Sequence, residues 1–307
     1  MASHHFAAQF LAGCDAAASA ALYSYTLYRV DNPDWAIPVY TCWSAATIYS
    51  RYITFSPRLI KLFESTPSSQ TYGIHFYTGM IASLMKAIAS AYALFELGDL
   101  VNPIFGIILA AILAGGGFFA LFSFLGDQPK AISDQNNRHI SQTFYGQTLT
   151  TYLSFCDAFL SATLYCHALN NHWQQHQTTQ NIAIWCLLAA MGTSVIYSRF
   201  IQFYPKIIER FGQSDNAQSR LCQAFCDHPQ TTIPGALGAL MKTAASGVSL
   251  FKLSQPVDEK LSTALICLFL PGAFVALFSL LGEDKKSIAI TDVTQHEEGY
   301  SPLQGQP

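Results

Sequence analysis

Two lysines of the chain lie deep inside long stretches that carry few other charges. Lys86 and Lys242 each fall near the middle of a long stretch of mostly uncharged residues. An ionisable side chain at that depth in a bilayer is costly and by default indicates a functional site. Residues three or four positions apart share a helix face, so small and polar residues would line the same face as each lysine. The two stripes are Gly79, Ser83, Lys86, Ser90 and Gly235, Ala239, Lys242, Ser246.

Asp15 and Asp157 are the natural partners of these lysines. Each lies in an apolar stretch that would cross the membrane in the same direction as the lysine-bearing stretch, at nearly the same depth by helical rise. Because an uncompensated buried charge is much worse than a paired one, we predict the pairs Asp15–Lys86 and Asp157–Lys242. Serines one turn from these charges could donate further hydrogen bonds: Ser19, Ser161, Ser90 and Ser246.

A buried pair can serve the passage of a solute, or it can only fix the register of two helices. In either case Lys86→Ala should damage folding more than the same change combined with Asp15→Asn. The single variant would leave a carboxylate without its counter-charge, whereas the double variant would leave neutral groups.

A second basic residue also occurs twice, in closely similar blocks. Arg51 follows Ile-Tyr-Ser at 48–50, and Arg199 follows the same three residues at 196–198. Both lie about 9 Å from the middle of their stretches by helical rise, on the side where an arginine can reach the headgroups. Pro57 and Pro205 are then expected to end the helices. The alternative is an inner-face site for an anion or lipid phosphate, made of Arg51, Arg199, Tyr49 and Tyr197.

Helix-breaking residues occur at corresponding places in the two halves of the chain. Gly115, Gly116 and Gly117 align with Pro271 and Gly272 and the residue after them. Glycine and proline loosen or kink a helix, and such interruptions in both halves of a transporter indicate its binding site. Tight crossing of two helices would select the same residues.

These matches belong to an internal repeat. Residues 48–63 and 196–211 are identical at nine of sixteen positions, and three further blocks match in the same order with insertions only in the polar stretches between. Repeated blocks at nearly fixed spacing indicate a duplicated unit. We predict one repeat at 10–132, a cytoplasmic linker at 133–151, a second repeat at 152–288, and a polar cytoplasmic tail at 289–307.

The composition favours a membrane protein. Only 11% of the residues are charged and 51% are hydrophobic, and a soluble helical domain would need charged outer faces on most of its helices. We therefore predict an all-α, polytopic integral membrane protein with eight transmembrane helices, arranged as two parallel four-helix repeats. Eight stretches with few charged residues are each long enough to span the bilayer: 6–28, 35–55, 77–97, 102–125, 148–169, 181–203, 233–253 and 261–281.

The distribution of lysine and arginine predicts the orientation. With eight spans, eleven of the sixteen basic residues fall on the side of the termini and three on the opposite side. Because basic residues accumulate on the inner side of a membrane, both termini are expected in the cytoplasm. Tyr300-Ser301-Pro302-Leu303 in the tail looks like a tyrosine-based sorting signal read by clathrin adaptors, which would imply an adaptor partner and an endosomal or plasma membrane.

Three classes of function remain to be weighed. A transporter or channel for a small solute, an anion among the candidates, explains why charges and helix breaks lie at mid-membrane. The alternative is a non-catalytic membrane scaffold or membrane-shaping protein in which the pairs only fix helix register. The chain has no HExxH, Gly-x-Ser-x-Gly or paired-carboxylate motif that would indicate an enzyme. We expect the lipid bilayer and a small molecule or ion as partners, and no cofactor, metal or nucleic acid.

Overall fold

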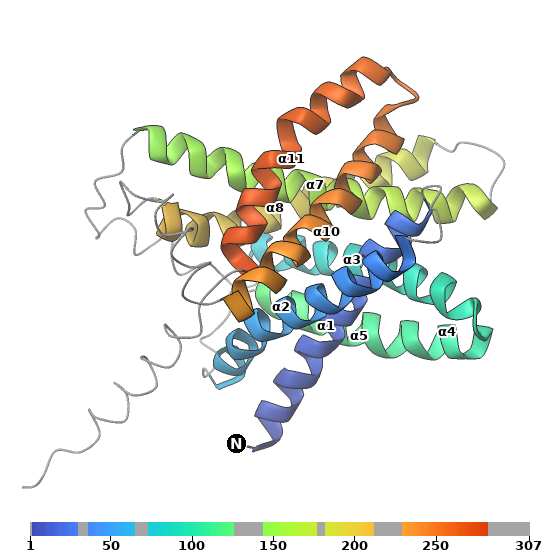
Figure 1. The fold of residues 1–307 in the computed structure, drawn as a ribbon, viewed down its shortest axis with the longest axis vertical. Helices are drawn as coiled ribbons and strands as arrows, with labels where there is room; N and C mark the ends of the chain where they lie inside the picture. Colours follow the sequence, from blue (N-terminus) through green and yellow to red (C-terminus); the bar gives the residue numbers. More distant parts are fainter. Residues whose placement is uncertain are drawn as a thin grey trace, which may run out of the picture.

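The computed structural model describes residues 2–29, 36–64, 73–125, 144–176, 182–211 and 229–281, and their regular structure is entirely helical. Eight helical segments follow one another along these residues (Figure 1). The fourth segment contains a π-helical turn, η1, between two α-helical parts. The elements are α1 (Ala2–Tyr28), α2 (Ala36–Glu64), α3 (Ile74–Asp99), α4 (Pro103–Leu109), η1 (Ala110–Ala114), α5 (Gly115–Leu125), α7 (Phe144–His176), α8 (Ile182–Phe211), α10 (Pro229–Ser254) and α11 (Glu259–Leu281).

Four of these segments are long and apolar enough to cross a membrane. They are α3, the combined segment Pro103–Leu125, the part of α8 at Ile182–Ile207, and α11. Helices α1, α2, α7 and α10 do not reach the same apolarity, so four of the eight expected spans have this support. Much of α1 and α7 is covered by other helices, and a covered helix can carry serine, threonine and tyrosine without exposing them to lipid.

Some expected boundaries are wrong. Pro57 lies inside α2 and Pro205 lies inside α8, so neither proline ends its helix. A proline removes one backbone hydrogen bond, and neighbouring helices and side chains in a packed membrane protein can satisfy the freed carbonyl. In addition, residues 144–151 of the expected linker form the first turns of α7, while 126–143 and the tail from 282 onward lie outside the described residues.

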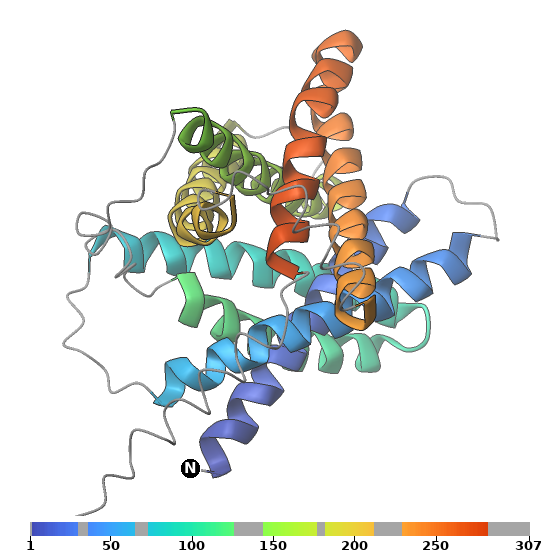
Figure 2. The same ribbon diagram turned by 60° about the vertical axis from the view of Figure 1, so that its left-hand side comes forward.

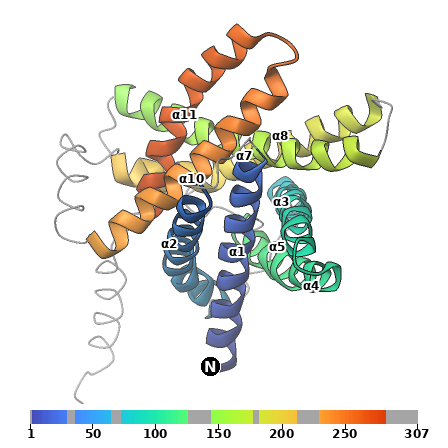
Figure 3. The ribbon, with the colours of Figure 1, turned by 45° about the vertical axis from the view of Figure 1, so that its right-hand side comes forward.

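The two halves of the chain use the same contacts between helices. In the first half, α1 lies between α2 on one side and α3 and α5 on the other (Figure 3). In the second half, α7 packs against α8, α10 and α11, and α10 and α11 run side by side as a hairpin (Figure 2). Corresponding residues also begin the last helix of each half. The Asn102 side chain accepts a hydrogen bond from the Ile104 amide at 2.9 Å, and Asp258 accepts one from the Lys260 amide at 2.8 Å.

The halves meet through their middle helices. Helix α2 packs against α10, and α3 packs against α8 and α7. The largest group of buried apolar residues lies at this junction and takes matching residues from both halves. Its members include Leu22, Tyr23, Met85 and Ala89 from the first half and Leu164, Tyr165, Met241 and Ala245 from the second. The charged residues that the sequence singles out are thus carried by the helices that build the centre of the molecule.

Candidate functional site

Asp15 connects three helices of the first half. Its Oδ2 accepts a hydrogen bond from Arg51 Nη2 on α2 at 2.6 Å, and its Oδ1 accepts one from Lys86 Nζ on α3. All three residues are buried, with at most 4% of their surface exposed. The predicted Asp15–Lys86 pair is present, and Arg51 is a third member that the pairing argument did not include. We call these three residues the Asp15 cluster.

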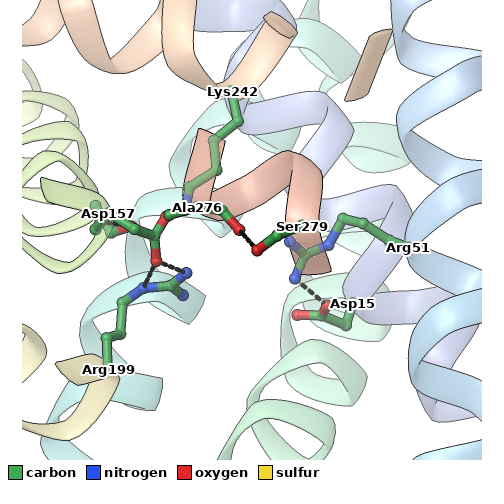
Figure 4. A network of polar contacts seen from close by, with 8 residues as sticks. Asp15, Arg51, Asp157, Arg199, Lys242, Ala276 and Ser279 are labelled. Atoms are coloured by element: carbon green, nitrogen blue, oxygen red, sulfur yellow. Dashed lines mark hydrogen bonds and ion pairs between the residues drawn. The ribbon is translucent and has the colours of Figure 1, made fainter. Parts of the chain in front are cut away.

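Asp157 forms the same arrangement in the second half (Figure 4). Its Oδ2 accepts hydrogen bonds from Arg199 Nη2 at 2.8 Å and Nε at 3.3 Å, and its Oδ1 accepts one from Lys242 Nζ at 2.6 Å. These residues, which we call the Asp157 cluster, are also at most 4% exposed. The same three residue types therefore meet on corresponding helices in both halves, and the predicted Asp157–Lys242 pair is present.

The arginines lie inside the protein, which corrects their expected position at the headgroups. Each guanidinium turns toward a buried carboxylate and lies over a phenylalanine one turn along its own helix. The guanidinium carbon of Arg51 is 4.9 Å from the centre of the Phe55 ring, and that of Arg199 is 4.8 Å from the Phe203 ring. Since an aromatic face attracts a cation, the repeated Arg-x-x-x-Phe spacing supports each buried arginine.

The four candidate serines differ in what they contact. Ser19 and Ser161 donate to the backbone carbonyls of Asp15 and Asp157, both at 2.7 Å, rather than to the carboxylates. A serine can satisfy its hydroxyl in this way inside a helix. Among the described residues the Ser90 and Ser246 hydroxyls have no hydrogen-bond partner, although both residues are 1% exposed. The small, polar stripes around the lysines are buried.

Gly116 and Gly117 of the fourth segment and Gly272 of α11 lie at close helix crossings. A methyl group added at Gly116 would lie 2.6 Å from Cβ and Sγ of Cys14, and one at Gly272 would lie 2.7 Å from Sγ of Cys156. Each of these cysteines immediately precedes the aspartate of its cluster. One added at Gly117 would be 3.4 Å from Cα of Asp15. The π-helical turn η1 ends directly before these glycines, and Pro271 lies inside the unbroken α11. Close packing against the aspartate-bearing helix therefore explains these small residues.

The remaining sequence candidates lie away from the clusters. Tyr49 is 46% exposed, and the Tyr197 hydroxyl lies 3.2 Å from Nδ1 of His75 while its ring stacks on the histidine. Gly115 has nothing within 4 Å of an added methyl group. The tail motif at 300–303 lies outside the described residues. The structure thus brings together the aspartates, lysines and arginines, and leaves Tyr49 and Tyr197, which were expected at the inner face, separate from them.

Each cluster holds one carboxylate and two cationic side chains. With all three groups ionised, a formal charge of plus one remains in each half, at the centre of the protein. Low polarity around a buried charge strengthens its attraction for an ion of opposite sign. In that ionised state the arrangement favours an anion over a cation nearby, and the ion pairs join three helices of each half around one carboxylate.

The repeated sequence block already held a signal that the arginines belong with the aspartates and lysines. Arg51 and Phe55 both belong to the block that recurs with Arg199 and Phe203, but helical rise alone places an arginine by its Cα and not by the end of its long side chain. Comparison of the chain with protein-family models, with curated proteins and with solved structures found no significant match. The chemistry of the two clusters is accordingly the basis for assigning a function.

Proposed function

We propose that the protein is an integral membrane transporter or channel for a small anionic solute. In this proposal eight helices span the bilayer as two parallel four-helix repeats, and both termini face the cytoplasm. The observation that carries it is the repeated buried cluster in which one carboxylate faces two cations. A protein that needed only neutral helix contacts would not bury three ionisable side chains together twice, because each buried charge is costly.

A single pair of substitutions tests the transport role with limited risk to folding. Changing Lys86 and Lys242 to Met removes the excess positive charge but retains both aspartate–arginine ion pairs. Purified protein in liposomes, loaded with a small anion and followed by efflux, should show flux for the native chain and a loss of at least about tenfold for the double variant. Lys252→Met, at an exposed position on α10, is the matched control and should retain flux.

A scaffold is the second candidate. It is favoured by the fact that both oxygens of each carboxylate are already bound, and by the glycine crossings that lock the neighbouring helices. A scaffold predicts no flux of any small anion or cation from the native protein. It further predicts that the lysine variants keep full function if they remain folded.

The orientation needs a separate measurement. Protease access to tags at the two ends, in sealed vesicles of known sidedness, should show both tags on the cytoplasmic side. Tags on opposite sides would contradict the eight-span arrangement, whatever the flux result.

A further inference from the structure

Two buried tyrosines lie at equivalent places in the halves and have unsatisfied hydroxyl groups. Tyr23 on α1 and Tyr165 on α7 are each 1% exposed and belong to the central apolar core. Neither hydroxyl has a hydrogen-bond partner among the described residues. Buried polar groups are nearly always hydrogen-bonded, and a tyrosine hydroxyl placed in a core usually has a partner. Two equivalent exceptions therefore need a common explanation.

The charges of both clusters act on these two tyrosines. Tyr23 interacts electrostatically with Arg51 and Arg199, one from each half, and with both aspartates. Tyr165 interacts with the same two arginines and with Tyr23 itself. Both tyrosines belong to the buried core that takes residues from the two halves and lies at their junction.

The kind of ligand follows from the donors. Each hydroxyl can rotate to donate one hydrogen bond, and the Nε–H of Arg51 also has no partner among the described residues. Single donors around an excess positive charge suit a small anion, whereas a cation would meet two like charges. The neighbouring side chains at the junction are tightly buried and apolar, among them Leu22 and Met85. A bulky organic anion would need to displace this core, so a small spherical one fits better.

We propose that Tyr23 and Tyr165 form a binding site for a halide-sized monovalent anion between the two halves, close to the Asp15 and Asp157 clusters. If the protein is a transporter, this site identifies small monovalent anions as the class of substrate, and that part of the inference rests on the proposed function. Binding itself does not, since an anion held permanently at the junction would also stabilise a scaffold by joining its halves.

Thermal unfolding of the purified full-length protein in detergent tests the site. Sodium chloride or bromide is titrated against sodium gluconate at constant ionic strength, so that general salt effects cancel. A ligand at ten times its dissociation constant should raise the Tm by about 3–6 °C. We expect this rise for the native chain and its loss in the variant carrying both Tyr23→Phe and Tyr165→Phe. The control Tyr77→Phe changes an exposed tyrosine and should keep the full rise.

The outcomes separate this inference from the proposed function. An equal rise in the native chain and the double Phe variant would overturn the site, and so would no rise at all in chloride or bromide. If the double variant is more stable than the native chain in gluconate but no longer responds to chloride, the site is supported and the variant is folded. Halide binding without flux would refute transport alone, while flux without a tyrosine-dependent response would refute the site alone.

Discussion

Removing the aspartate of a cluster should be far more damaging than removing its lysine. Asp15→Asn leaves Arg51 and Lys86 as two buried cations with no counter-charge, whereas Lys86→Met leaves the Asp15–Arg51 ion pair at 2.6 Å intact. This order differs from that expected for an isolated Asp–Lys pair, in which loss of the lysine would leave an unpaired carboxylate. The arginine changes the result because it supplies a second counter-charge.

The magnitudes follow from the charges that remain. Breaking a buried ion pair by removing one partner costs about 3–5 kcal/mol, and two cations roughly 5 Å apart repel each other by about 3 kcal/mol at an effective dielectric constant of about 20. Asp15→Asn should therefore cost at least about 5 kcal/mol, which is comparable to the whole stability of many domains. Lys86→Met loses one charge-assisted hydrogen bond but also removes a cation–cation repulsion, so its cost should stay within about 2 kcal/mol.

The assay measures the fraction of detergent-solubilised protein that still elutes as a single species after heating to a series of temperatures. The midpoint of its loss is the Tm. Asp15→Asn should yield little folded protein, Lys86→Met should be close to native, and the combined variant should recover only in part because Arg51 remains unpaired. Asp99→Asn, at an exposed position at the end of α3, is the control and should have no effect. Equal damage from Asp15→Asn and Lys86→Met, or additive effects in the combination, would refute the three-membered cluster.

Three further predictions concern the surroundings of the cluster. Gly116→Ala should lower stability by about 1–3 kcal/mol through overpacking, while Gly115→Ala, which meets nothing within 4 Å, should leave the Tm unchanged or slightly higher; equal effects would contradict the close crossing. Phe55→Leu should lower the free energy of unfolding by about 1–2 kcal/mol, because the ring beneath the buried guanidinium is lost; an unchanged Tm would show that this contact contributes nothing. Cys14 should react with a membrane-permeant maleimide only after unfolding, whereas the exposed Cys42 should react in the native protein. Mass spectrometry of labelled peptides measures both reactions, and labelling of Cys14 before Cys42 would contradict this prediction.

Much of the candidate site can be read from the sequence because the chain contains it twice. A charged residue kept at the same place in two copies of an apolar helix must be compensated in both, so Lys86 and Lys242 indicate their partners Asp15 and Asp157. The helical character and the helix order follow from the apolar stretches and the polar residues between them. Helix ends are less certain, as Pro57 shows, because a packed helix can continue through a proline.

The tertiary structure decided what the ends of long side chains contact. Helical rise places Arg51 only by its backbone, which led us to expect its side chain at the headgroups, but the side chain extends several ångströms and pairs with the buried carboxylate of Asp15. It also decided that Gly116 and Gly272 serve a close crossing and that Tyr23 and Tyr165 are buried in one core with unsatisfied hydroxyls, since such contacts depend on how whole helices pack. Local pattern determines which residues must be buried and paired. Only the packing of the two halves determines which side chains share the central core, because that core takes residues from both halves and belongs to neither alone.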